Sequence, residues 1–382
     1  MTRATGGAAR TTIRDGGIGA LRLIARNACE FATPFMLGLA YEFYPMETWG
    51  PYQKAERLPE RLGHCRGARA PRCRVRLPSV FVPAPLADPR FEILVDAAFG
   101  AGDRTAAAGL PTPPGPGAGW LRAVALGGRG HYAAARTELA RVRRTGPDPV
   151  LRALVDSTTG SLLRQLGWHA AAAEFDGRAA AAVVPHLARA RHPAAPGLPD
   201  GVDAACDALT GLAADALGVG RLDLARRLLD RTAALLDAHA DTATTAGTAD
   251  ITDRTRVRIR LHWVAAETAL AAGDAARARP HAEAGLRLAQ DWSSVRHRVK
   301  SRLLVAATAA AAGDRADSAA RATAVAAEAR AHGLLPLRWA AAMLLAGVGD
   351  SEHARAAAAA EAATCAAEIA CRGGRFRPAQ TC

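Results

Sequence analysis

The chain has 382 residues, of which half are apolar and only 5% aromatic, and it carries a formal net charge of +13. An apolar half is enough for a large core, but with so few aromatic side chains that core must consist of Ala, Leu and Val. No stretch reaches the roughly 18–20 consecutive apolar residues of a membrane-spanning helix, so we expect no membrane partner. Ala has the highest helix propensity, so this composition favours closely packed helices over sheets.

The positive charge is almost entirely arginine, because Lys54 and Lys300 are the only lysines. An Ala/Arg/Gly/Pro-rich chain with so little lysine is typical of a very GC-rich genome, such as that of an actinobacterium. Residues 1–90 hold 14 basic and 7 acidic residues, whereas residues 91–382 hold 35 basic and 29 acidic ones. The longer part is therefore only mildly basic, and we do not expect a nucleic-acid partner.

Seven cysteines are spread along the chain, and no two of them have C-x-x-C spacing. An odd number of thiols in a long chain is typical of a reducing compartment, so we expect a cytoplasmic protein with free thiols. His64, Cys65 and Cys73 fit no zinc pattern, because a fourth ligand is missing. We expect neither a metal nor a cofactor.

The composition divides the chain near residue 85. Residues 1–85 are basic, are interrupted repeatedly by proline and show no sustained helical periodicity. We expect this segment to be disordered or to precede the natural start of the protein. Residues 86–372 are expected to form one helical-repeat domain, followed by a disordered tail at residues 373–382.

From Phe91 onward a short turn, Ala-Gly-Asp or a close variant, recurs between Ala-rich apolar stretches. Its glycine suits the left-handed residue that ends a helix, and an aspartate after it can cap the next helix. A small residue follows a few positions later, where the second helix passes close to the first. The turns are centred on Gly102, Gly130, Gly167, Gly220, Gly273, Gly313 and Gly349. Without the intervening loops they mark units of about 35–40 residues, the size of a helix–turn–helix repeat.

Two of these units repeat each other at an offset of 40 residues. Residues 250–274 and 290–314 align without a gap. The alignment matches Arg256 with Arg296, Arg258 with Arg298, Arg260 with Lys300, and Thr268 with Thr308. Residues 335–350 repeat the helix again, with Trp339 at the place of Trp263. A general alanine bias does not account for the shared basic run, so the match indicates stacked helix pairs with a continuous core.

Three of the turns resemble the tetratricopeptide repeat. Residues 130–135 read Gly-His-Tyr-Ala-Ala-Ala and are followed by Pro147, which is similar to the family's Gly-x-Tyr-x-x-Ala turn and terminal proline. Residues 220–225 and 273–278 match the same turn. The resemblance covers roughly residues 91–370, although the spacing departs from the family's usual repeat. It implies an all-α superhelix, a TPR-like solenoid of antiparallel helix pairs, preceded by a poorly ordered N-terminal segment.

Proteins of this family bind peptides, partner proteins or small effectors on a concave face, which is lined by the first helix of each pair. On the family's pattern Arg260 and Lys300 take the second position of that helix, Trp263 and Trp339 the fifth, and Glu267 the ninth. The resemblance therefore implies a groove of cations and indole rings, which suits an acidic peptide or a carboxylate end. A plainer interpretation stays open, in which the tryptophans fill the core and the arginines face solvent.

The sequence contains no catalytic motif that we can identify. Neither lysine lies in a Gly-rich phosphate loop, and there is no G-x-S-x-G and no H-E-x-x-H. His262 and His297 stand alone in helical stretches, where histidines usually pack or face solvent. We therefore do not expect an enzyme.

The sequence favours an interaction scaffold that binds a protein or peptide partner, with an acidic partner fitting best. One alternative is the sensory, effector-binding module of a transcriptional regulatory system whose DNA-binding part lies elsewhere. Another is a weak nucleic-acid binder that uses the Arg-rich helix starts near residues 254–260 and 296–302.

Overall fold

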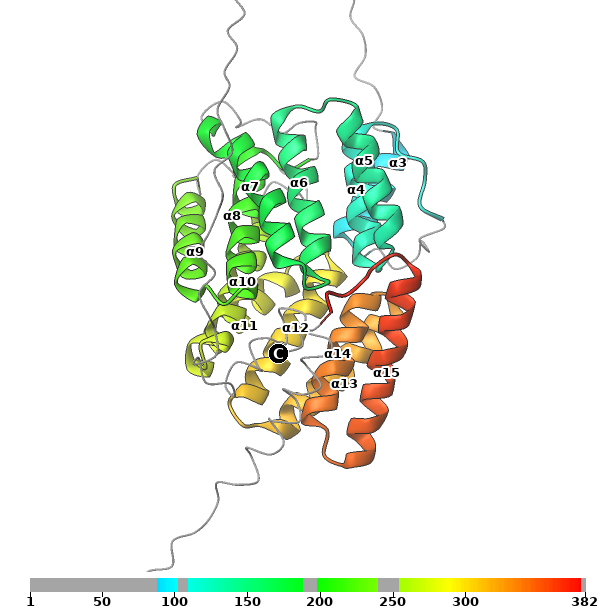
Figure 1. The fold of residues 1–382 in the computed structure, drawn as a ribbon, viewed down its shortest axis with the longest axis vertical. Coiled ribbons are helices and arrows are strands. Elements are labelled where there is room, and N and C mark those ends of the chain that lie inside the picture. Colours follow the sequence, from blue (N-terminus) through cyan, green and yellow to red (C-terminus); the bar gives the residue numbers. More distant parts are fainter. Residues whose placement is uncertain (1–87, 102–108, 188–197, 240–253, 379–382) are drawn as a thin grey trace, which may run out of the picture.

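A computed structural model describes residues 88–101, 109–187, 198–239 and 254–378 (Figure 1). Within these ranges the chain forms α-helices, one 3-10 helix and no strand, which confirms the expected all-α class. In chain order the helices are α3 (Pro89–Phe99), α4 (Pro116–Gly128), α5 (Tyr132–Arg144), α6 (Pro149–Arg164), α7 (His169–Val183), η4 (Val184–His186), α8 (Gly201–Gly218), α9 (Leu222–Asp237), α10 (Thr255–Ala271), α11 (Ala275–Gln290), α12 (Val295–Ala311), α13 (Arg315–Ala331), α14 (Leu335–Val348) and α15 (Glu352–Cys371). None of the described helices is long and apolar enough to cross a bilayer. The predicted N-terminal segment, residues 1–85, lies outside the described residues.

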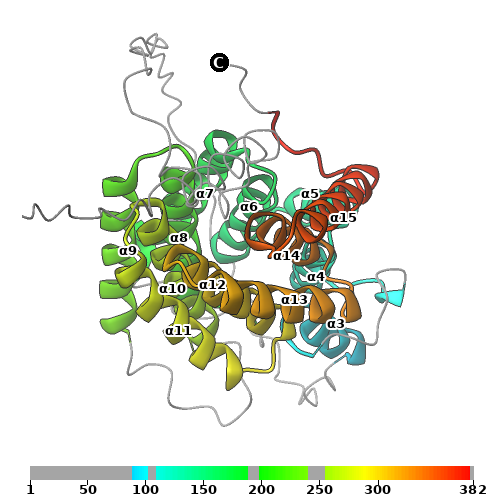
Figure 2. The same ribbon diagram turned by 90° about the horizontal axis from the view of Figure 1, so that it is seen from below.

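After α3 the helices form six pairs, from α4–α5 to α14–α15, and each pair is joined by one of the predicted Gly turns. Each helix packs against the next, and the first helices of neighbouring pairs also pack on one another, as α6 does on α8 and α8 on α10. Figure 2 shows the pairs curving round so that α14–α15 lies beside α4–α5. The first helices of the pairs therefore form the inner wall of the superhelix.

Of the seven predicted turn glycines, Gly102 lies outside the described residues, and five of the other six adopt the predicted left-handed conformation. The angle φ is +82° at Gly130 and Gly167, +77° at Gly220, +72° at Gly273 and +87° at Gly313. Asp274 and Asp314 then cap the following helices by accepting hydrogen bonds from the backbone N–H groups of Arg277 and Asp317. The local chemistry of the turn thus sets where each pair folds back.

The sixth turn, at Gly349, departs from this pattern. Gly349 has a φ of −51°, so it is not left-handed. Asp350 does not cap α15. Ser351 does so instead, because its Oγ accepts a hydrogen bond from the backbone N–H of Ala354.

Small side chains let the two helices of a pair approach closely, as the sequence predicts. Ala135, Ala225 and Ala278 are completely buried, whereas Ala354 is only partly buried. The buried side chains are mostly Ala, Leu and Val. Close alanine contacts therefore replace the aromatic packing that this composition does not provide.

The last helix pair closes against the first. The backbone N–H of Ala133 in α5 donates to the carbonyl oxygen of Arg372 at 3.0 Å. At the other side of the superhelix, the backbone N–H of Val295 in α12 donates to the carbonyl oxygen of Gly100 at 3.2 Å. These contacts join segments that are far apart in the sequence, so the superhelix closes round its concave face.

The start of the predicted disordered tail takes part in this closure, which corrects the boundary placed at residue 373. The backbone N–H of Arg377 donates to the carbonyl oxygen of Leu166 at 2.8 Å. The Phe376 ring stacks on Trp339 with the ring centroids 4.8 Å apart. Residues 373–378 are therefore held against the superhelix, and the rest of the tail lies outside the described residues.

A buried ionic network joins α6, α7 and α8. Arg164 donates from Nη1 to Asp176 Oδ2 at 2.8 Å and to Asp215 Oδ1 at 2.7 Å. Gly160 and Gly211 leave room for the Asp176 carboxylate, since a Cβ at either position would lie within 2.6 Å of it. Burial raises the pKa of Asp176 to about 7, because desolvation and the negative charge of Asp215 outweigh the attraction of Arg164.

A second buried network joins α10 to α8. Arg254 donates to both carboxylate oxygens of Asp200, at 2.7 and 2.8 Å, and lies 2.8 Å from Asp203 Oδ1. Arg256 Nη2 lies 2.7 Å from Asp207 Oδ2. Burial raises the pKa of Asp203 to about 6. Helix α8 thus supplies the carboxylates that position the helices on both of its sides.

Two glycines offer a matched test of the turn. A Cβ at Gly313 or at Gly177 would have no heavy atom within 4 Å, so the two substitutions differ in backbone conformation. Gly313→Ala places alanine at a φ of +87° and should lower the free energy of unfolding by about 1 kcal/mol. Gly177→Ala, inside α7, should raise it by about 0.5–1 kcal/mol. Urea unfolding followed by circular dichroism measures both, and changes of the same sign would contradict this account of the turn.

The raised pKa of Asp176 predicts a pH dependence. Its ordinary value is 3.8 and its folded value about 7, so between them the folded chain binds more protons and loses stability as the pH rises. Asp176→Asn keeps the neutral form, so the wild type should lose several degrees of Tm relative to this variant between about pH 5 and about pH 8. The buried histidines have lowered pKa values, so their contribution to stability increases as the pH rises. This contribution is the same in the wild type and in the variant and does not change the Tm difference. A Tm difference that does not change with pH would contradict the raised pKa.

Candidate functional site

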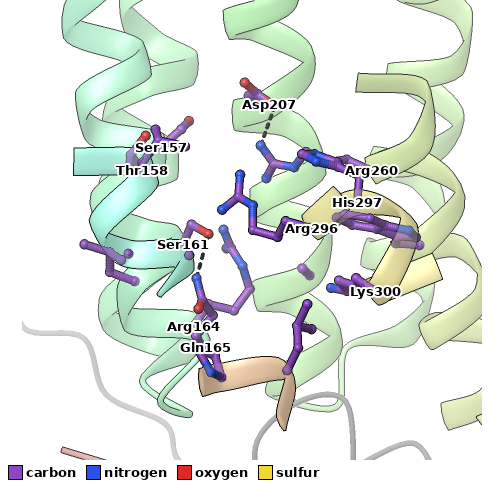
Figure 3. Close-up of a pocket in the computed structure, with 18 of the residues that line it drawn as sticks. Ser157, Thr158, Ser161, Arg164, Gln165, Asp207, Arg260, Arg296, His297 and Lys300 are labelled. Carbon is purple, nitrogen blue, oxygen red and sulfur yellow. Dashed lines mark hydrogen bonds and ion pairs between the residues drawn. The ribbon is translucent and has the colours of Figure 1, made fainter. Parts of the chain in front are cut away.

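The concave face surrounds a central cavity of about 250 Å³ that is partly open to solvent. Its wall comes from the first helix of every pair (α4, α6, α8, α10, α12 and α14), with single residues from α3, α5, α15 and the tail. Figure 3 shows side chains of α6 on one side of it and side chains of α10 and α12 opposite. This volume is near the lower end of the range for small-molecule sites.

All five residues that the tetratricopeptide pattern placed on the concave face line this cavity. They are Arg260, Trp263 and Glu267 from α10, Lys300 from α12 and Trp339 from α14. They come from the first helices of the fourth, fifth and sixth pairs, so the pattern identified residues that are neighbours in space. Their role in binding stays a prediction.

The two tryptophans fit both interpretations of the sequence, because they belong to the core and also line the groove. Trp263 is 8% exposed and Trp339 is 3% exposed, so both belong to the buried core, and both also contribute to the cavity wall. Trp263 Nε1 donates to Ser301 Oγ at 2.8 Å. Because this donor is satisfied within the protein, the indole offers apolar surface to the cavity.

His297 packs beside these groups as a neutral side chain. Its ring stacks on Trp263 with the centroids 5.1 Å apart, and its Nδ1 lies 2.8 Å from Ser294 Oγ. Burial, together with the positive charge of Arg296, lowers the pKa of His297 well below its usual range. Among the described residues, no group of three or more His, Cys, Asp or Glu is arranged to hold a metal ion.

Most cations on the cavity wall are paired with carboxylates. Arg256 and Arg260 share Asp207 of α8, and Lys300 Nζ lies 3.2 Å from Glu267 Oε1. Arg256 is buried, and Arg260 is directed at α8. The interpretation in which these arginines face solvent is therefore wrong for both.

Arg296 differs from the other cavity cations. Its guanidinium makes one long hydrogen bond, from Nη2 to the carbonyl oxygen of Ala98 at 3.4 Å, and we find no carboxylate of the described residues within ion-pair distance. Burial, with the positive charges of Arg260, Arg256 and Arg129, lowers the pKa of Arg296 to about 10. It therefore remains a cation at neutral pH, and it lies in a positive environment.

The wall formed by α6 is polar. It contributes Ser157, Thr158, Ser161, Arg164 and Gln165 (Figure 3). Thr158 Oγ1 accepts a hydrogen bond from Trp120 Nε1 at 2.9 Å. The hydroxyl oxygens of Ser157 and, on α8, Thr210 are buried and have no hydrogen-bond partner among the described residues. These two hydroxyls keep a free hydrogen-bonding capacity at the cavity wall.

Sequence reasoning missed Arg296 and the polar side chains of α6. A signal for Arg296 existed, because it precedes Lys300 by four residues and the repeat aligns it with Arg256. Residues four apart share one face of a helix, so the two cations of α12 could have been assigned together. Helix α6 belongs to no recognisable copy of that repeat, and its serines gave no comparable signal.

Comparisons with known proteins do not identify a family for this helical arrangement. No protein-family model matches the chain, and no curated protein matches it. The helical-repeat arrangement is therefore established by the packing of consecutive helices, and the likeness to tetratricopeptide repeats stays a resemblance of turns and helix order.

Proposed function

We propose that this chain is a non-enzymatic binding protein whose concave face takes a small-molecule effector, as the sensory module of a regulatory system. The observation that carries the proposal is that the helices close round a small cavity. An open solenoid offers its concave face to a protein partner, whereas here that face surrounds a cavity of about 250 Å³. A small molecule fits such a space and a folded partner does not.

The chemistry of the cavity wall supports holding a ligand over transforming one. Its carboxylates, Asp207 and Glu267, are already engaged by cations. His297 is neutral and is hydrogen-bonded to Ser294. Among the lining residues we find no nucleophile within hydrogen-bond reach of a general base, which covalent catalysis requires.

We further propose that the chain is a divergent tetratricopeptide-like protein of actinobacterial origin that works in the cytoplasm. The turn pattern, the arginine-rich composition and the absence of C-x-x-C spacing support these points.

A second candidate is recognition of an extended peptide, as in an interaction scaffold. The chain's own tail favours it, because residues 373–378 are not helical and lie against the superhelix. Phe376 reaches the cavity wall and stacks on Trp339. A peptide partner with an aromatic residue would replace this segment.

Nucleic-acid binding by the Arg-rich start of α10 has less support. Arg254, Arg256 and Arg260 are paired with carboxylates of α8. Side chains engaged in this way do not form an exposed basic surface that could meet phosphate groups.

Native mass spectrometry tests the cavity site without knowledge of its ligand. The full chain, incubated with a small-molecule extract of bacterial cells, should carry a 1:1 adduct that is released unchanged. Ala340→Phe, on the cavity wall, should abolish the adduct by filling the space. Ala320→Phe, on an exposed part of α13, is the control and should retain it.

The proposed function fails if the wild type carries no adduct, or if Ala340→Phe carries as much as the control. A bound molecule that is released with an altered mass would instead indicate an enzyme.

The peptide candidate has its own test. A fluorescent peptide with the sequence of residues 372–378 should bind weakly to the full chain, because the attached tail competes for the same place. Phe376→Ala should raise its affinity about tenfold by removing the stacking on Trp339, as measured by fluorescence anisotropy. Phe175→Ala in α7 is the control, and equal affinities for Phe376→Ala and the wild type argue against the peptide.

A further inference from the structure

We infer that the cavity is built for a small organic anion with one oxyanion head, a carboxylate or a phosphate, and an apolar body, and that Arg296 receives the head. This inference rests on the proposed function and narrows it to one class of ligand. It depends on the charge balance of the cavity, the fit of Arg296 into the wall, the unpartnered hydroxyls and the apolar remainder of the lining.

Among the described residues, the charge balance of the cavity leaves one cation without a carboxylate partner. The cations that line the cavity are Arg164, Arg256, Arg260, Arg296 and Lys300. The carboxylates paired with them are Asp176, Asp207, Asp215 and Glu267. Every one of these cations except Arg296 is in an ion pair, and the cations around Arg296 make its position more positive still.

The fold makes room for the Arg296 side chain. Gly128, near the end of α4, faces it, and a Cβ at Gly128 would lie 2.9 Å from Arg296 Cδ and 3.0 Å from Nη1. Figure 3 shows Arg296 reaching into the space between α6 and Arg260. Arg296 is partly buried, and a partly desolvated guanidinium without a counter-ion loses solvation free energy. A bound oxyanion would offset this cost, because the planar guanidinium donates two parallel hydrogen bonds to such a group.

Further groups can complete the coordination of the head. Arg260 and Lys300 line the cavity near Arg296. Ser157 and Thr210 carry buried hydroxyls without hydrogen-bond partners among the described residues. An oxyanion has more lone pairs than one guanidinium satisfies, so donors of Arg260 and Lys300 match its remaining need, and rotation of the Ser157 or Thr210 side chain would bring a further donor to it.

The rest of the wall suits an apolar body. It includes the side chains of Trp120, Val124, Leu162, Leu303 and Trp339. Trp120 Nε1 already donates to Leu154 O and Thr158 Oγ1, so its indole adds no free donor. An inorganic anion would leave this surface unfilled, and a sugar would find few partners on it. The combination of an anionic end and an apolar end therefore identifies an amphipathic organic anion.

Four probes separate the head from the body. Phenylacetate carries both, phenylacetamide has the body without the charge, acetate has the head alone, and phenyl phosphate carries the alternative head. Titration calorimetry with the full chain, at constant chloride concentration, should show phenylacetate or phenyl phosphate binding at least about tenfold more tightly than phenylacetamide and acetate. The better of the two heads identifies the carboxylate or the phosphate.

Variants of α12 assign the head to Arg296. Arg296→Met should reduce the affinity for the preferred acid to that of phenylacetamide. The Tm of the free chain should stay the same or rise, because an unpaired, partly buried charge is removed. Arg302→Met lies on the same helix but removes a surface ion pair with Glu328, so it should leave binding unchanged. Arg296→Gln, which retains hydrogen-bond donors, is the second variant should Arg296→Met fold poorly.

The inference is overturned if phenylacetamide binds as tightly as the acids, if acetate alone binds as tightly as phenylacetate, or if Arg296→Met and Arg296→Gln both bind like the wild type. A lowered Tm in both Arg296 variants with an unchanged preference for acids would assign Arg296 a structural role instead. A neutral molecule in the native mass spectrum would overturn the ligand class while leaving the proposed function intact. The absence of any adduct and of any probe binding would remove both.

Discussion

The backbone at the end of α15 is hydrogen-bonded to the start of α5, and the rest of the molecule depends on this contact. Ala133 donates to Arg372, and the Arg372 guanidinium donates back to the carbonyl oxygen of Arg129 at 3.0 Å. In an open solenoid each pair stabilises only its neighbours. Here the sixth pair also stabilises the first, so the curvature of the whole stack has to match. The same closure reduces the access of solvent to the inner face, and that changes what its charged side chains require.

In a space of low dielectric, each charge needs a counter-charge. Helix α8 meets this need for both of its neighbours, because Asp215 faces Arg164 of α6 while Asp207 faces Arg256 and Arg260 of α10. Such pairs add little net stability, yet a wrong helix register would leave buried charges uncompensated. The ion pairs of α8 therefore determine mainly how the helix pairs align. Arg296 differs because no carboxylate of the described residues lies within ion-pair distance of it.

The sequence predicts much of this architecture, because the relevant signals are local. A glycine that must be left-handed and a small residue a few positions later determine a turn and a close helix contact without reference to the rest of the chain. This explains why the turns at Gly130 and Gly313 were placed correctly. The sixth turn was placed less well, because Asp350 and Ser351 are adjacent and both can cap a helix.

Contacts between segments that are far apart in the chain could not be predicted from the sequence. Closure between Ala133 and Arg372 depends on the summed curvature of six pairs, which no single repeat encodes. The repeat pattern brought Arg260 and Trp263 to the concave face, but Asp207 of α8, the partner of Arg260, lies outside the repeated segment. For that reason the pairing of Arg260 with Asp207 and the isolation of Arg296 emerge only from the structure.

If the chain acts as a sensory module, closure of the superhelix would couple ligand binding in the cavity to a conformational change. The contact of Phe376 with Trp339 is part of the cavity wall. An anion held by Arg296 of α12 would contact the closed state better than an opened one, since opening would readmit water to the guanidinium. A ligand shifts a conformational equilibrium by its difference in affinity for the two states. The free energy that Arg296 gains from its counter-ion would thus favour the closed superhelix, and the tail that completes the wall would report whether the cavity is occupied.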